Sequence, residues 1–381
     1  KYLFIGVLAS AVPFIITPYY AVIGGWVTKY MAAYIFEGAN ALAGDGYFTG
    51  FIINNPETYF WMALFILLVV AVVALGVKNG IERVNKVLMI LLIGMAVAIS
   101  IFSLTLPGAL EGLAYYLIPD FSKFSVEMIV AAMGQMFFSL SLAMGIMITY
   151  GSYFDKNEDL EHSVRRIELF DTGIAILAGF MIIPAAVAVM GGADAVAGNA
   201  GPGLMFGILP QVFQGMGWAA SVIGFAFFAL VFFAALTSCI SLFETLVSIV
   251  ADGAHLSRAV SIVICAVFVL AMGTLVNMGY NNLLEVDLMY TLFGIGEPGN
   301  AQLLDFFDFL SNTILMPIVA LLTCVFVGWI IKPKIILTEV RQSSEFKSAK
   351  LFVVMIKYVA PVFVVVILVA YVMAAAGIIV L

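Results

Sequence analysis

Carboxylates inside apolar segments are the side chains of this chain most able to do chemistry. Asp171 lies in FDTGIAILAGFMIIPA with no basic neighbour on its helical face, and Glu244 lies in CISLFETLV. If such segments cross a membrane, a charged side chain is costly and marks a functional site. A sodium or proton site would explain Asp171, and a side chain that snorkels to the interface is the alternative. Glu244 could serve a gate, a proton step or a water-facing role.

Hydroxyl groups form a second candidate site in the segment Ala234–Ser238. In a helix, Ala234, Thr237 and Ser238 share one face. Two hydroxyls and a nearby carbonyl are hard oxygen ligands that suit a small cation such as Na⁺. Threonine and serine also pack membrane helices against one another, so a purely structural role stays open.

Small and polar residues interrupt the apolar segment GQMFFSLSLAMGIMITYGSY, residues 134–153. Ser139, Ser141 and Gly145 would permit an unwound stretch, and discontinuous helices present free backbone groups to substrates and ions. A continuous helix with small packing residues is the alternative. Asp305 and Asp308 lie one turn apart near the start of a later segment, where a carboxylate can also complement a helix dipole.

The composition shows which elements must position these groups. Of 381 residues, 64% are apolar and 10% are charged, and the mean hydropathy is +1.16. Soluble domains carry about 25% charged residues. The chain is therefore interpreted as an all-α polytopic membrane protein, which excludes soluble enzymes and DNA-binding folds. Three cysteines lie inside apolar runs and form no disulfide or metal motif.

Nine apolar runs are long enough to span a bilayer, which requires about 20 residues. They cover residues 3–34, 59–76, 87–106, 125–150, 168–190, 216–250, 259–276, 306–331 and 351–379. The semi-apolar segment 191–215 between two of them is expected to re-enter the membrane, to cap a vestibule, or to be an ordinary extracellular loop with one short helix.

The distribution of Lys and Arg predicts the orientation. If residue 1 is cytoplasmic, the cytoplasmic side collects every Lys and Arg of the 16 in the chain except Lys29 and Lys123. The C-terminus is then extracellular, and a cell membrane (plasma or inner) is the expected location.

Several segments, in order, resemble the neurotransmitter:sodium symporter family, in particular its bacterial amino-acid transporters with the leucine-transporter-like fold. The matching segments are PFIITPYYAVIGGW (13–26), GQMFFSLSLAMGIMITYGSY (134–153), LFDTGIAILAGFMIIPA (169–185), AGPGLMFGILPQVF (200–213), FFAALTSCISLFE (232–244) and LLDFFDFLSNTILMP (303–317). They resemble the family's third, sixth and seventh helices, its loop before the eighth helix, and its eighth and tenth helices.

This resemblance implies a single transporter domain over 1–381 with nine of the family's helices, the third to the eleventh. The family fold contains two inverted five-helix repeats with sites at broken helices near the midplane. Residues 1–106 would be the remainder of the first repeat, 125–331 the second repeat and 351–379 an additional helix. The family's first two helices have no counterpart in the given sequence and are expected upstream, where they would complete the site.

The resemblance also assigns roles to single residues. The substrate-binding positions are Ile16, Tyr20, Phe138, Ser139, Ser141, Met144, Ser238 and Leu242. Tyr20, Gln135, Phe138 and Asp308 match the outer gate, where Gln135 and Asp308 would meet an arginine of the first family helix. The sodium ligands would be Ser139 and Asp171 in one site, and Ala234, Thr237 and Ser238 in the other.

One departure from the family pattern is informative. Asp171 stands where the family usually has an asparagine, and Ala175 stands where chloride-dependent members have a serine. A fixed carboxylate can supply the negative charge that chloride otherwise provides. The sequence therefore predicts chloride independence.

The combined prediction is a sodium-coupled symporter of neutral apolar or aromatic L-amino acids that works by alternating access. Its partners would be the amino acid, Na⁺ and the lipid bilayer, with two sodium sites, no organic cofactor, no nucleic acid and no enzymatic activity. A proton-coupled transporter using Asp171 or Glu244, or a receptor that keeps the pocket without transport, are the alternatives.

Overall fold

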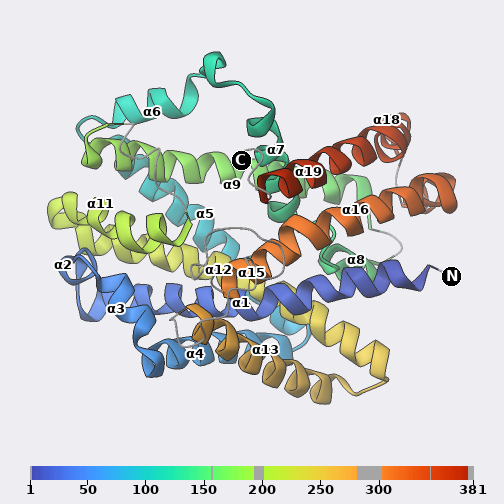
Figure 1. The fold of residues 1–381 in the computed structure, drawn as a ribbon, viewed down its shortest axis with the longest axis horizontal. Helices are drawn as coiled ribbons and strands as arrows, with labels where there is room; N and C mark the ends of the chain where they lie inside the picture. The colour runs from blue at the N-terminus through green and yellow to red at the C-terminus, as the bar shows by residue number, and fades with distance from the viewer. Residues whose placement is uncertain (1, 156–157, 193–200, 281–302, 344, 376–381) are drawn as a thin grey trace.

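The fold is a bundle of long helices, seen in a computed structural model that describes residues 2–155, 158–192, 201–280, 303–343 and 345–375. This part of the chain contains no β-strand. Eight of its helical segments are long and apolar enough to cross a membrane. Figure 1 shows them running roughly side by side along the long axis of the molecule.

Six of the spans are α1 (Leu3–Phe36), α4 (Asn55–Ala74), α5 (Arg83–Leu104), α9 (Leu160–Met190), α12 (Ala220–Ala254) and α13 (Arg258–Tyr280). Three spans contain π-helical turns. One such turn, Val77–Glu82, precedes α5 in the span Val77–Leu104. In the other two, α15 (Leu303–Asp308) continues through Phe309–Leu315 into α16 (Met316–Val325) and then through Phe326–Ile330, and α18 (Ala349–Val354) continues through Met355–Val359 into α19 (Ala360–Ala375). The shorter helices are α2 (Ala39–Leu42), α3 (Tyr47–Ile53), α6 (Ala109–Leu117), α7 (Val126–Ser139), α8 (Ile146–Ser152), α11 (Leu209–Gly215) and α17 (Lys334–Val340).

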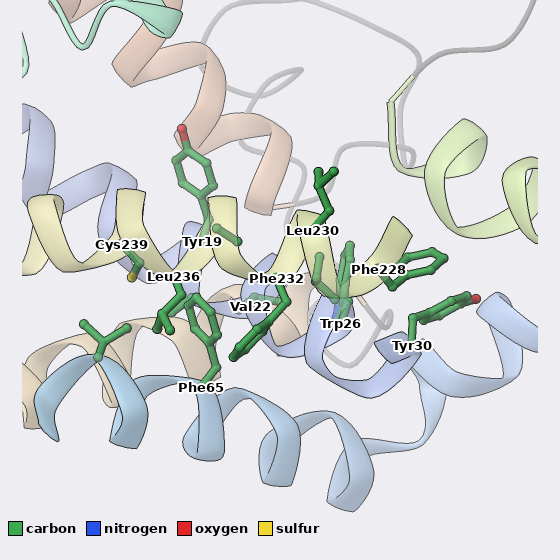
Figure 2. Close-up of a cluster of buried hydrophobic side chains, with 14 of the residues drawn as sticks. Tyr19, Val22, Trp26, Tyr30, Phe65, Phe228, Leu230, Phe232, Leu236 and Cys239 are labelled. Atoms are coloured by element: carbon green, nitrogen blue, oxygen red, sulfur yellow. The ribbon is translucent and has the colours of Figure 1, made fainter. Parts of the chain in front are cut away.

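Helices α1 and α12 form the centre of the bundle, with α4 packed against both. Figure 2 shows Trp26 and Tyr30 of α1 beside Phe228 of α12. The rings of Tyr30 and Phe228 have centroids 5.0 Å apart, and Trp26 is 1% exposed. These large side chains hold the two helices in one fixed register, as the close-packed interior of a protein requires.

Two adjacent glycines allow α4 to approach α1. A Cβ on Gly24 would lie 2.3 Å from Cε1 of Phe65, and a Cβ on Gly25 would lie 2.7 Å from the backbone nitrogen of Met62. Helices in a bilayer gain little from apolar burial and depend on such close backbone contact. The glycine pair therefore fixes the distance between α1 and α4.

The apolar run 125–150 is broken, and the continuous-helix alternative is wrong. Helix α7 ends at Ser139 and α8 begins at Ile146. Between them Ser141, Ala143 and Gly145 have φ values of 54°, 62° and 80°, which lie in the left-handed region where an α-helix cannot continue. The run is therefore the discontinuous helix that the family resemblance implies, next to the eight continuous spans.

Two other boundaries differ from the sequence reading. Helix α9 begins at Leu160, before the apolar run at 168, because Asp159 caps it by accepting a hydrogen bond of 3.0 Å from the backbone N–H of His162. In segment 191–215, whose described part begins again at residue 201, a π-helical turn (Gly203–Ile208) leads into α11, and α11 packs against α12 and α9.

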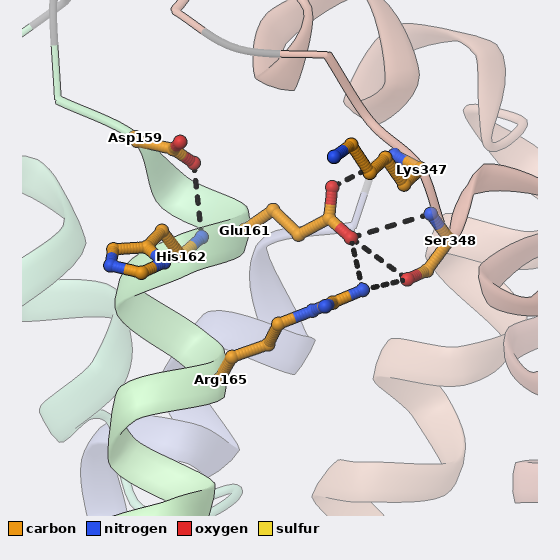
Figure 3. A network of polar contacts seen from close by, with 6 residues as sticks. All are labelled: Asp159, Glu161, His162, Arg165, Lys347 and Ser348. Atoms are coloured by element: carbon orange, nitrogen blue, oxygen red, sulfur yellow. Dashed lines mark hydrogen bonds and ion pairs between the residues drawn. The ribbon is translucent and has the colours of Figure 1, made fainter.

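A polar clasp joins the start of α9 to the chain just before α18 (Figure 3). The carboxylate of Glu161 accepts hydrogen bonds from the backbone N–H groups of Lys347 (2.9 Å) and Ser348 (3.3 Å) and from the Ser348 hydroxyl (2.8 Å). Arg165 forms an ion pair of 2.9 Å with the same carboxylate and donates to the Ser348 hydroxyl at 2.9 Å. Glu161 therefore satisfies amide groups at the start of α18 that have no partner within that helix.

A buried lysine, Lys29, forms an ionic cluster near the C-terminal end of α1. Lys29 is 8% exposed, and its ammonium group lies 2.6 Å from Glu37 and 2.7 Å from Glu57. The Tyr47 hydroxyl donates to Glu37 at 2.8 Å. Burial alone would raise the pKa of Glu37, but the hydrogen bonds from Lys29 and Tyr47 hold that pKa below its ordinary value. The cluster ties α3 and α4 to α1.

Candidate functional site

The break between α7 and α8 brings the first pair of candidate ion ligands together. The Ser139 hydroxyl at the end of α7 donates a hydrogen bond of 2.5 Å to Oδ1 of Asp171 on α9. Asp171 is half-buried and forms no ion pair within the described part of the chain. A carboxylate and a hydroxyl in contact form an incomplete set of hard oxygen ligands, which suits a small cation.

The second pair of candidate ligands lies on α12. Thr237 donates its hydroxyl proton back to the carbonyls of Phe233 and Ala234, both at 3.0 Å. Its oxygen lone pairs remain free to accept a cation. Ser238, the next residue, is exposed and interacts with the hydroxyl of Tyr20 on α1. This interaction joins the tyrosine and serine positions that the family resemblance assigns to substrate binding, one on α1 and one on α12.

The apolar side chains that the family resemblance assigns to the substrate pocket lie in the hydrophobic core. Ile16 on α1, Met144 in the helix break and Leu242 on α12 are all buried members of the same hydrophobic core, and Phe138 packs against it. A Cβ on Gly145 would lie 3.3 Å from a methyl carbon of Thr245 and 3.9 Å from Pro13. At Gly145 the break therefore packs between α1 and α12. Ser141 also lies within the break and is half-buried.

The residues carried over to the outer gate have different hydrogen-bond partners in the described part of the chain. Asp308 accepts hydrogen bonds from the Tyr19 hydroxyl at 3.1 Å and from the Asn312 side-chain amide at 2.6 Å. Its hydrogen bond to α1 thus comes from Tyr19, whereas Tyr20 faces Ser238. Gln135 is exposed on α7, and the structure does not join it to Asp308.

Glu244 is the centre of a buried ionic network. It is completely buried, and its carboxylate accepts hydrogen bonds from Arg258 at 2.8 and 2.6 Å and from the Tyr153 hydroxyl at 2.7 Å. Arg258 also donates to the backbone carbonyl of Val73 at 3.0 Å. Four helical elements, α4, α8, α12 and α13, meet here, so Glu244 does not face water.

Sequence reasoning named Glu244 but missed its partners Tyr153 and Arg258, and it missed Tyr19 and Asn312 beside Asp308. Arg258 is the first residue of α13, the helix that follows α12. The pattern of a carboxylate in one apolar helix and an arginine at the start of the next could have indicated this ion pair. No spacing rule links Tyr19 to Asp308, which lie far apart in the chain and meet only through the packing of α1.

Sequence and structure comparisons agree on one family. The model of the sodium:neurotransmitter symporter family matches residues 52–378. This chain belongs to that family. A sodium-dependent transporter of Haemophilus influenzae is 33% identical over 362 residues, which cover 93% of this chain and 76% of the relative. The sodium-dependent transporter YhdH of Bacillus subtilis is 32% identical over 347 residues, which cover 90% of this chain and 73% of the relative.

A solved structure supports the same assignment at the level of the fold. The crystal structure of MhsT in complex with L-phenylalanine matches this symporter-family chain with a TM-score of 0.83 and 33% sequence identity, covering 97% of this chain and 81% of that one. MhsT has the leucine-transporter fold. The expected fold class is therefore confirmed, and the relatives are sodium-dependent transporters rather than enzymes.

Proposed function

We propose that this family member is a chloride-independent sodium symporter of neutral apolar or aromatic L-amino acids. The observation that carries the proposal is the contact between Ser139 and Asp171 at a helix break. It brings a carboxylate and a hydroxyl from α9 and α7 together beside irregular backbone, and the interaction of Tyr20 with Ser238 joins α1 to α12. Family membership supports coupling to Na⁺.

The apolar walls support the proposed class of substrate. Ile16, Phe138, Met144 and Leu242 carry no charge that could pair with an acidic or basic side chain. Methionine is unbranched and adaptable, so side chains of different sizes should fit. Tyr20 would contact the substrate carboxylate, and Ser139, Ser141 and Ser238 would supply polar contacts. The L-phenylalanine bound to MhsT is consistent with this class.

Two cations would bind at the oxygen groups. Ser139 and Asp171 would hold one Na⁺, while the Ala234 carbonyl and the hydroxyls of Thr237 and Ser238 would hold the other. Bound Na⁺ would supply positive charge next to the substrate carboxylate, so that ion and substrate binding favour one another. Asp171 would provide the negative charge that makes chloride unnecessary.

Alternating access would then open the site to one side of the membrane at a time. Tyr20, Phe138, Gln135 and Asp308 would form the outer gate. In this proposal residues 1–106 and 125–331 belong to the two inverted repeats, 351–379 is the additional helix, residue 1 is cytoplasmic and the C-terminus is extracellular. The Glu244–Arg258 pair would then lie toward the cytoplasmic side of the site. The protein would lie in the plasma or inner membrane.

Substrate competition tests this proposal. Binding of tritiated L-phenylalanine to the reconstituted protein in Na⁺ should be displaced by Trp, Tyr, Phe and Leu before Gly, and hardly by Lys or Glu. Displacement by Lys or Glu that exceeds displacement by Leu would exclude the apolar pocket. A parallel measurement of uptake, with a proton gradient in place of Na⁺, would detect a proton-coupled transporter.

A further inference from the structure

The adjacent tyrosines of α1 face two different partners. Consecutive helical residues are rotated by about 100° from one another, so Tyr19 and Tyr20 cannot serve the same neighbour. Tyr20 interacts with Ser238 of α12, while Tyr19, 3% exposed, donates to Asp308 near the start of the α15–α16 span. One turn of α1 therefore connects the proposed substrate site to the proposed outer gate.

The Asp308 carboxylate is held through one oxygen only. The hydrogen bonds from Tyr19 and from Asn312 both end on Oδ1. A carboxylate has about four lone-pair positions on its two oxygens, so Oδ2 is left for a donor that comes from outside this cluster. Tyr19 on α1 and Asn312, one turn after Asp308, restrain the carboxylate from two directions and thus fix where Oδ2 points.

Asn312 adds a second acceptor beside this carboxylate. Its amide nitrogen is committed to Asp308, while its Oδ1 is buried and has no hydrogen-bond partner in the described part of the chain. A buried acceptor without a donor is unfavourable. The charged Asp308 also forms no ion pair among the described residues, although it lies within a spanning segment. A cationic donor with several N–H groups would satisfy both acceptors.

We propose that Tyr19 and Asn312 are positioning residues of the outer gate, which hold Asp308 Oδ1 so that Oδ2 faces the gate's cationic partner. The inference rests on the proposed role of Asp308 in that gate. Tyr19 does not touch the substrate in this scheme. Instead, its hydrogen bond couples the position of α1, which carries the proposed substrate-binding Tyr20, to the position of the Asp308 carboxylate.

The rate at which bound substrate escapes measures gate closure directly. The reconstituted protein is loaded with tritiated L-phenylalanine in Na⁺ and then diluted into unlabelled substrate. Removing one hydrogen bond to a charged group should speed release about tenfold in Tyr19→Phe and in Asn312→Ala. Tyr30→Phe is the matched control, because Tyr30 is also buried on α1 and donates to the Phe206 carbonyl at 2.9 Å. It should release substrate at the wild-type rate.

A double-mutant cycle separates positioning from a merely structural role. Asp308→Asn should speed release at least as much as Tyr19→Phe, and the double variant should be no faster than Asp308→Asn alone. Wild-type release from Tyr19→Phe with fast release from Asp308→Asn would overturn the inference and leave the gate in place. Fully additive effects would overturn it as well. Wild-type release from Asp308→Asn would remove Asp308 from the gate, and the inference with it.

Discussion

At the scale of single residues, the proposed ion coupling depends on Asp171. Its carboxylate contacts Ser139 and has no ion-pair partner among the described residues. In Asp171→Asn the site loses its fixed negative charge. This variant should therefore create or strengthen a dependence of transport on chloride. Uptake measured in chloride and in gluconate tests this. Equal uptake of Asp171→Asn in both anions would show that the account of Asp171 is wrong.

The hydroxyls of α12 give a second prediction at this scale. Thr237→Ala combined with Ser238→Ala removes two oxygen ligands from one site, so the Na⁺ concentration for half-maximal uptake should rise about tenfold or more. Thr274→Ala is the matched control, since Thr274 on α13 also donates to a helix carbonyl, that of Leu270 at 2.8 Å. An unchanged sodium requirement in the double variant would place the second cation elsewhere.

At the scale of elements, the polar clasp between α9 and α18 should stabilise the bundle. Glu161→Ala removes the acceptor of three hydrogen bonds and one ion pair, so the segment just before α18 loses its attachment to α9. The midpoint of thermal unfolding in detergent should fall. Glu82→Ala is the control, because the exposed Glu82–Lys86 pair of 2.8 Å lies within one helical segment and contributes little. Equal midpoints for the two variants would argue against the clasp.

The ionic cluster around Lys29, near the C-terminal end of α1, predicts that the stability of the protein depends on pH. The pKa of Glu37 is lowered in the folded protein by Lys29 and Tyr47. The ionised carboxylate therefore adds stability at neutral pH, and this contribution is lost as the pH falls below 4.5 and through the lowered pKa. Glu37→Gln should unfold at a lower temperature than the wild type at neutral pH. The two proteins should converge in acid, and a constant difference across the pH range would contradict the assignment.

The sequence predicted the elements better than it predicted their contacts. Apolar run length located the spans because a bilayer demands it, and the family resemblance predicted a broken helix within residues 134–153. The start of α9 was missed because residues 160–167 are polar, although Asp159 caps them into the helix. The family resemblance placed Ser139 and Asp171 in one site, and the structure brings these residues of α7 and α9 into contact. No such guide existed for Tyr19, which reaches Asp308 only through the packing of α1. Helical spacing carries no information on such contacts between elements.

At the scale of the whole molecule, a closely packed helix pair lies next to an interrupted helix. The central pair α1 and α12 is rigidly packed by aromatic residues (Figure 2), whereas the break between α7 and α8 leaves the backbone irregular beside it. Irregular backbone within a membrane is tolerated where it is buried or lines a cavity. This division into a packed centre and an interrupted helix is what ion-coupled alternating access needs.

Uptake driven by a sodium gradient is the most direct test of the central claim. Proteoliposomes containing the reconstituted protein are loaded with sodium-free, chloride-free buffer and diluted into tritiated L-phenylalanine with external Na⁺ gluconate. The account predicts accumulation above the external concentration, and its loss when Na⁺ is replaced by choline or the gradient is collapsed by an ionophore. Equal uptake in choline, or uptake that follows a proton gradient alone, would contradict it.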